Sequence, residues 1–232
     1  INGIQWNNEI LEYILGKIKE DNLKHFVNIG SHIGTVSLKV SKFIEKVSCV
    51  EAYPPTYKHL CCNIKLNNIQ NISTYNVGVG NTKGNIYFMS EEMICPKENI
   101  NRVKNNSGGM HSFTENDIKN NTRSSELCDK KIVGKSDLFN SMDIDHFDIM
   151  LVDIEGCEYN FLQGGKEKIE KNMPIIIIEI WDNEKRRNEN MKETREEVIQ
   201  FILSMNYEMI KQVDDDFIFS PLSQKKVSTN TT

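Results

Sequence analysis

The chain alternates short apolar runs with longer amphipathic stretches, which predicts alternating strands and helices. The apolar runs typical of buried strands cover residues 24–29, 47–52, 73–79, 147–153 and 175–180. Apolar side chains recur at helical spacing over residues 1–20, 35–44, 56–67, 159–171 and 196–205. A strand–helix order of this kind predicts an α/β fold with parallel strands and right-handed crossovers. The whole chain, 1–232, is therefore expected to be a single domain, with an N-terminal helix within residues 1–23.

The C-terminal part follows another pattern. Residues 207–213 and 217–220 are strand-like and are separated by three consecutive aspartates, Asp214 to Asp216. Two strands joined by so short a polar turn predict an antiparallel hairpin that closes the sheet.

Residues 85–135 interrupt the alternation. Short strand-like runs at 85–89, 110–114 and 131–134 stand between polar stretches, and Ser136 looks like the N-cap of a helix over 137–142. A long excursion inside a compact domain is usually functional or disordered. We expect a flap that covers the substrate; a mobile surface insertion is the alternative.

Composition excludes several classes of protein. The net charge is −5 and the isoelectric point is near 5.6, which argues against a partner that presents a nucleic-acid backbone. The longest apolar run, residues 174–180, is too short to span a membrane. Six cysteines without a C-x-x-C pair predict free thiols in the cytoplasm or another reducing compartment. A first residue other than Met favours a domain excised from a longer chain.

The stretch HFVNIGSHIGTVS, residues 25–37, predicts a strand, a glycine turn and the start of a helix. Glycines let a ligand approach the backbone, and the first N–H groups of a helix attract anions. Glu51 ends the next strand roughly 20 residues on, where such folds place a carboxylate that binds ribose. Only Gly30 and Gly34 are present, so the three-glycine dinucleotide fingerprint is incomplete, and an NAD-dependent oxidoreductase remains the alternative.

Five motifs together resemble the FkbM-type S-adenosylmethionine (SAM)-dependent methyltransferases. They are FVNIGSHIGTVSL, CVEAYP, LNN, VDIEGCEYNFLQGG and PIIIIEI, and they extend from about residue 26 to residue 181. The most specific is VDIEGCE, residues 152–158, which matches a D-x-E-G-x-E pattern. The resemblance implies a Rossmann-like class I methyltransferase fold: a mostly parallel seven-stranded sheet, helices on both faces and a C-terminal antiparallel hairpin. It also implies O-methylation of a hydroxyl group, most typically of a sugar or glycan.

The resemblance further implies which residues bind SAM. Glu51 would hold the ribose hydroxyls, Gly30 and Gly34 would lie under the methionine part, and Asp153 would lie near the methyl group. The full implied set is Asn28, Gly30, Ser31, His32, Gly34, Glu51, Ala52, Val77, Gly78 and Asp153. Asn28 and His32 depart from the family, which usually has Asp and Asn there, so a non-catalytic cofactor-binding module is a further alternative.

Methyl transfer to an alcohol needs a base or a metal ion. Asp153 is the leading candidate base, with Glu155 and His111 as alternates. Asp153, Glu155 and Glu179 are also candidate ligands for a divalent cation. Trp181 and His111 are candidate substrate contacts. For Trp181, an equally good alternative is a purely structural position at the rim of the sheet. The alternative for Glu155 and Gly156 is that they only cap the helix that follows, and Glu158 is interpreted as a structural residue of its first turn.

Overall fold

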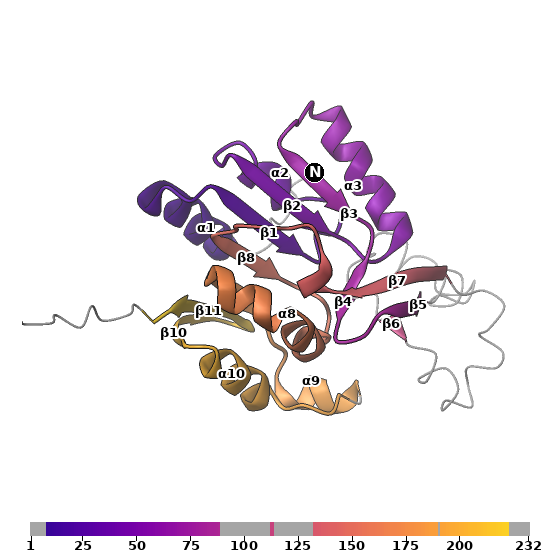
Figure 1. The fold of residues 1–232 in the computed structure, drawn as a ribbon, viewed down its shortest axis with the longest axis vertical. Coiled ribbons are helices and arrows are strands. Elements are labelled where there is room, and N and C mark those ends of the chain that lie inside the picture. The colour runs from indigo at the N-terminus through magenta and orange to yellow at the C-terminus, as the bar shows by residue number, and fades with distance from the viewer. Residues whose placement is uncertain (1–7, 89–111, 114–131, 190, 223–232) are drawn as a thin grey trace, which may run out of the picture.

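The computed structural model describes residues 8–88, 112–113, 132–189 and 191–222. A seven-stranded sheet forms its centre (Figure 1). In spatial order its strands are β10 (Tyr207–Val213), β11 (Asp216–Pro221), β9 (Ile175–Glu179), β8 (Ile149–Val152), β1 (His25–Ile29), β2 (Lys46–Val50) and β3 (Ile72–Tyr75). β11 runs antiparallel to β9 and β10, and the other neighbours are parallel. The mostly parallel sheet with a closing hairpin is therefore confirmed.

Helices cover both faces of this sheet. They are α1 (Asn8–Asp21), α2 (Ser37–Val40), α3 (Pro54–Leu66), α8 (Glu158–Asn172), α9 (Asn183–Asn188) and α10 (Arg195–Ser204). Buried residues of α1, α2 and α3 share one apolar cluster with Phe26 of β1, whereas those of α8 and α10 share another with Val27. Phe26 and Val27 are adjacent in a strand, so they point to opposite faces, and each face has its own core.

A second sheet, drawn beside the carboxyl ends of the central strands in Figure 1, accounts for part of the excursion. It contains β4 (Gly78–Gly80), β7 (Ile132–Leu138), β5 (Gly84–Phe88) and β6 (Ser112–Phe113). The strand expected over 73–79 is thus two strands in different sheets. Between them, the side-chain amide of Asn76 donates to the backbone oxygen of Glu51 at 2.8 Å and fixes the change of direction.

One expectation about a helix was wrong. Residues 137–142 do not form a helix: β7 extends to Leu138 and a single 3₁₀ turn, Phe139–Ser141, follows it. Pairing of Ser136 with both Gly78 and Gly84 draws this segment into the second sheet. The charged stretch after residue 181 contains the short helix α9, which Asp182 caps by accepting from the Lys185 N–H at 2.8 Å.

The predicted flap over residues 85–135 is described only in β5, β6 and the start of β7; the remainder, with His111, lies outside the described residues. No helix in the described ranges is long and apolar enough to cross a membrane.

The position of β1 sets the position of the site. β1 lies between β2 and β8. β2 and β3 follow on one side of it, and β8 and β9 follow on the other, so the strand order reverses at β1. Ligands of open parallel sheets bind beyond the carboxyl ends of the strands at such a reversal of strand order. Asn28, Glu51 and Asp153 therefore reach the same edge, although they are far apart in the sequence.

Candidate active site

A tight glycine loop joins β1 to α2. Gly30 has φ +83°, and a Cβ there would overlap the carbonyl oxygen of Asp153. The N–H groups of Gly30 and Ser31 both donate to the backbone oxygen of Val50 at 2.9 Å. The loop is therefore wedged between the ends of β8 and β2, and a residue other than glycine at position 30 has neither the space nor the backbone preference to form it.

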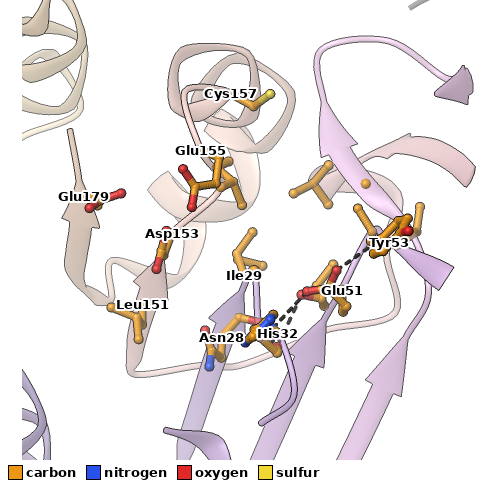
Figure 2. Close-up of a pocket in the computed structure, with 18 of the residues that line it drawn as sticks. Asn28, Ile29, His32, Glu51, Tyr53, Leu151, Asp153, Glu155, Cys157 and Glu179 are labelled. Carbon is orange, nitrogen blue, oxygen red and sulfur yellow. Dashed lines mark hydrogen bonds between the residues drawn. The ribbon is translucent and has the colours of Figure 1, made fainter. Parts of the chain in front are cut away.

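The carboxylate of Glu51 is held by two backbone donors (Figure 2). The His32 N–H donates to Oε2 at 2.9 Å and the Tyr53 N–H donates to Oε1 at 2.8 Å. The side chain is 8% exposed, and this burial raises the pKa of Glu51 despite the two hydrogen bonds. Each oxygen keeps further acceptor capacity, so a preoriented carboxylate faces the cavity and can accept two hydroxyl groups.

Asn28 presents an unused acceptor. Its Nδ2 donates to the Ser37 hydroxyl at 2.8 Å, whereas its buried Oδ1 has no hydrogen-bond partner among the described residues. The residue is 3% exposed and lines the cavity. A buried acceptor without a partner is costly, so this oxygen favours a ligand with an N–H donor at this point.

These groups line a cavity of about 550 Å³, a size suited to a small organic ligand. One end is apolar: Ala52, Tyr53, Val77, Gly78, Val79, Ile86 and Phe88 line it. The rings of Tyr53 and Phe88 pack with centroids 5.1 Å apart. The second sheet thus supplies part of the cavity wall next to Glu51, and this described part of the predicted flap lies at the opposite end from Glu155 and Glu179.

The other end of the cavity is acidic. Figure 2 shows the carboxylates of Asp153, Glu155 and Glu179 bordering the same space, and all three line the cavity. Burial is the main cause that raises the pKa of Asp153 to about 8, and the neighbouring charges, Glu179 first, add to it. Asp153 is thus an acid that changes its charge near neutral pH, which suits proton transfer.

The metal hypothesis is not supported. Although the three carboxylates border one cavity, no group of three His, Cys, Asp or Glu side chains within the described ranges is arranged to hold a metal ion. Glu179 instead accepts a hydrogen bond from the indole N–H of Trp181 at 3.0 Å.

Trp181 does not reach the cavity. It is 2% exposed and does not line the cavity, and the Lys185 ammonium lies over its ring, 3.5 Å from the centroid. The structure therefore favours the structural alternative for Trp181 and brings Lys185 to the cavity in its place.

Nine of the ten residues expected to bind the cofactor line the cavity. The exception is Gly34, where a Cβ would meet Leu60 at 2.7 Å in the core beneath the loop. Sequence reasoning missed Tyr53, Ile86, Phe88, Cys157 and Lys185. Ile86 and Phe88 have the two-residue spacing of one strand face, but nothing in the sequence indicates what that face covers.

A comparison with protein-family models decides the identity. The model described as the methyltransferase FkbM domain matches residues 28–209. This chain belongs to the FkbM methyltransferase family. A comparison with curated protein sequences gave no significant match.

Solved structures with the same class I methyltransferase fold include the methyltransferase FkbM from Methylobacillus flagellatus KT. It has a TM-score of 0.54 and 14% identity, over 86% of this chain and 44% of that one. The N-methyltransferase NodS from Bradyrhizobium japonicum WM9 has a TM-score of 0.54 and 10% identity, over 95% and 97% of the two chains. A putative caffeoyl-CoA O-methyltransferase from Staphylococcus aureus has a TM-score of 0.52 and 10% identity, over 92% and 83%. The fold therefore occurs with both O- and N-methyltransferases.

Membership of the FkbM methyltransferases implies SAM as the cofactor, and the cavity fits that molecule. The unsatisfied Asn28 oxygen suits the ammonium group, Glu51 suits the ribose, and the apolar end suits the adenine. Two observations count against the NAD-dependent alternative: the glycine loop lacks the third glycine of the dinucleotide fingerprint, and the matched family uses SAM.

Gly30→Ala is expected to destabilise the protein by about 3 kcal/mol or more, because the methyl group would overlap the Asp153 carbonyl and φ is positive. Gly16→Ala is the matched control: no atom lies within 4 Å of a Cβ in the middle of α1, so this change should stabilise by about 0.5–1 kcal/mol. Chemical denaturation of both variants measures the difference. Equal effects would contradict the wedged loop.

Proposed function

We propose that this chain is a SAM-dependent O-methyltransferase that acts on a hydroxyl group of a sugar or glycan. The observation that carries the proposal is the half-buried carboxyl group of Asp153. The backbone carbonyl of Asp153 packs against Gly30, its side chain borders the acidic end of the cavity, and the pKa of that carboxyl group is raised to about 8. Asp153 is therefore a base that can accept the proton of a hydroxyl group near physiological pH.

In the proposed reaction, SAM supplies a methyl group bonded to a positively charged sulfur. The acceptor oxygen would take this methyl group in place of its proton, the sulfur would leave with the electrons of its bond to carbon, and Asp153 would accept the hydroxyl proton. Because this step neutralises the sulfonium charge, a dry and aligned site favours it. The close packing of Gly30 on Asp153 fixes the base relative to the cofactor loop.

The acidic end favours polyhydroxylated acceptors over anionic ones. Carboxylates such as Glu155 and Glu179 accept hydrogen bonds from hydroxyl groups and repel other anions. Lys185 is the one basic side chain described at this end of the cavity. We also propose a reducing compartment, because Cys49, Cys61 and Cys62 are free thiols.

The direct experiment measures transfer of a labelled methyl group from SAM to neutral sugars, glycans, uronic acids and amines. The proposal predicts alkali-stable label in a neutral sugar or glycan and none in the uronic acids. Label confined to amines would assign N-methylation instead. Binding of S-adenosylhomocysteine (SAH) without transfer to any acceptor would favour the non-catalytic module.

Glu51→Ala is expected to weaken SAH binding by about 1.5–3 kcal/mol, or about 10- to 150-fold, because hydrogen bonds to a charged acceptor are lost. Calorimetric titration measures this change, and a melting curve checks that the loop remains folded. Glu45→Ala is the control, since Glu45 is an exposed carboxylate just before β2. An unchanged affinity at Glu51→Ala would reject the ribose assignment.

Phe88→Ala is expected to weaken SAH and adenosine binding by the same factor, about tenfold, because buried apolar contact with the adenine is lost. Val133→Ala in the same small sheet should change neither, because Val133 is 50% exposed and lies away from the cavity. A loss for SAH with none for adenosine would place Phe88 at the methionine part instead.

The preference for SAM over SAH is expected to rise between about pH 6.5 and pH 9. Asp153 is protonated and neutral below its pKa of about 8 and anionic above it, so only the higher pH provides an anion for the sulfonium cation. The ratio of the two dissociation constants should change about fivefold, and Asp153→Asn should abolish the change. A ratio that does not change with pH in the unmodified protein would show that Asp153 does not lie near the sulfonium.

A further inference from the structure

The segment that follows β9, residues 181–189 and 191–193, packs against the turn that carries Asp153 and Glu155. Arg186 of α9 is 2% exposed, and Glu158 at the start of α8 is 1% exposed. The two form an ion pair, with Arg186 Nη1 donating to Glu158 Oε2 at 3.2 Å. Arg186 Nε also donates to the backbone oxygen of Glu193 at 2.7 Å, which fixes the guanidinium within its own segment.

The same Glu158 carboxylate holds the turn. Its Oε1 accepts the N–H of Gly156 at 2.6 Å, so one side chain joins α9 to the residue that follows Glu155. Glu155 has φ +53° and Gly156 has φ +95°. A glutamate in the left-handed region is uncommon and is maintained by its surroundings. The hydrogen bond from Gly156 to Glu158 supplies that restraint.

Two further contacts connect the segment to the acidic end. A Cβ at Gly156 would overlap the terminal methyl group of Met191, so Met191 packs directly on the turn. Trp181 donates to Glu179 at 3.0 Å. The segment therefore restrains the turn of Glu155 and the side chain of Glu179, and Lys185 of the same helix lines the cavity.

We propose that Arg186, acting through Glu158, is a positioning residue for the acceptor end of the site. The pair keeps the Glu155–Gly156 turn in the conformation that directs the Glu155 carboxylate to the cavity. Stability alone does not account for such a pair, because replacing a buried ion pair by apolar groups is often neutral or stabilising. This inference rests on the proposed function only in treating the acidic end as the acceptor side.

The first test needs no acceptor. Selective ¹⁵N-glycine labelling of a chain with 13 glycines gives a spectrum simple enough to follow the Gly156 amide. Arg186→Met is expected to speed exchange of the Gly156 N–H at least tenfold, because Glu158 loses the guanidinium that holds its side chain in place. Glu158→Ala should have the same effect, whereas Glu158→Gln should preserve the slow exchange because the Gln oxygen still accepts. Gly16 and Gly84 are internal controls.

Arg187→Met is the matched control variant, since Arg187 is the exposed neighbour of Arg186 on α9. Should Arg186→Met not fold, two other variants replace it. The double variant Glu158→Gln/Arg186→Met leaves no buried charge, and Arg186→Lys keeps the positive charge beside Glu158. Unchanged Gly156 exchange in a folded Arg186→Met protein would overturn the proposal and leave the pair as a core contact.

The second test separates the two ends of the cavity. Arg186→Met is expected to leave SAH affinity within about twofold and to raise the KM and lower the kcat for an acceptor found by the labelling experiment. A loss of SAH affinity as large as the loss of acceptor turnover would overturn the acceptor-side assignment. If no acceptor is methylated while Gly156 exchange responds as expected, the proposed function fails and the positioning role stands.

Discussion

The contact between Gly30 and the backbone of Asp153 is the constraint on which the site depends. β1 and β8 are neighbours in the sheet, and the glycine loop turns directly over the end of β8. Because no side chain separates the two, the loop that would hold the cofactor and the carboxyl group that would take the proton form one rigid unit. The hydrogen bonds from Gly30 and Ser31 to Val50 extend this unit to β2, so Glu51 belongs to it as well.

Burial gives the carboxyl groups of this unit their chemistry. Glu51 and Asp153 both have raised pKa values, chiefly because the folded protein removes them from water. Two backbone N–H groups offset part of that effect at Glu51, whereas the anions around Asp153 add to it. Similar side chains at the ends of neighbouring strands therefore have different properties: one is a restrained hydrogen-bond acceptor, and the other changes its charge near neutral pH.

The cofactor side of the site was predictable from the sequence because its signals are local. Glycines at 30 and 34, the buried run before them and the acid at 51 lie within a single strand–helix–strand unit. Outside this unit, Val77, Gly78 and Asp153 were assigned to the cofactor through the family resemblance, and they too line the cavity. The second sheet was not predictable in the same way. Whether Ser136 starts a helix or continues a strand depends on pairing with Gly78 and Gly84, more than 50 residues earlier in the chain. The burial of Trp181 likewise depends on Lys185 and on tertiary packing that the spacing of apolar residues in the sequence does not indicate.

The two ends of the cavity are built from different parts of the chain, and this division has a consequence for specificity. Residues 28–53 and 77–88 form the end suited to the adenosyl cofactor, whereas Asp153, Glu155, Glu179 and Lys185 form the acidic end. The acidic end contacts the segment after β9 through Glu158, Gly156 and Glu179. A change in that segment can therefore alter the acceptor end while the glycine loop and Glu51 keep their geometry. One fold can in this way retain one cofactor and accept different substrates, because the binding energies of the two ligands arise from separate contacts.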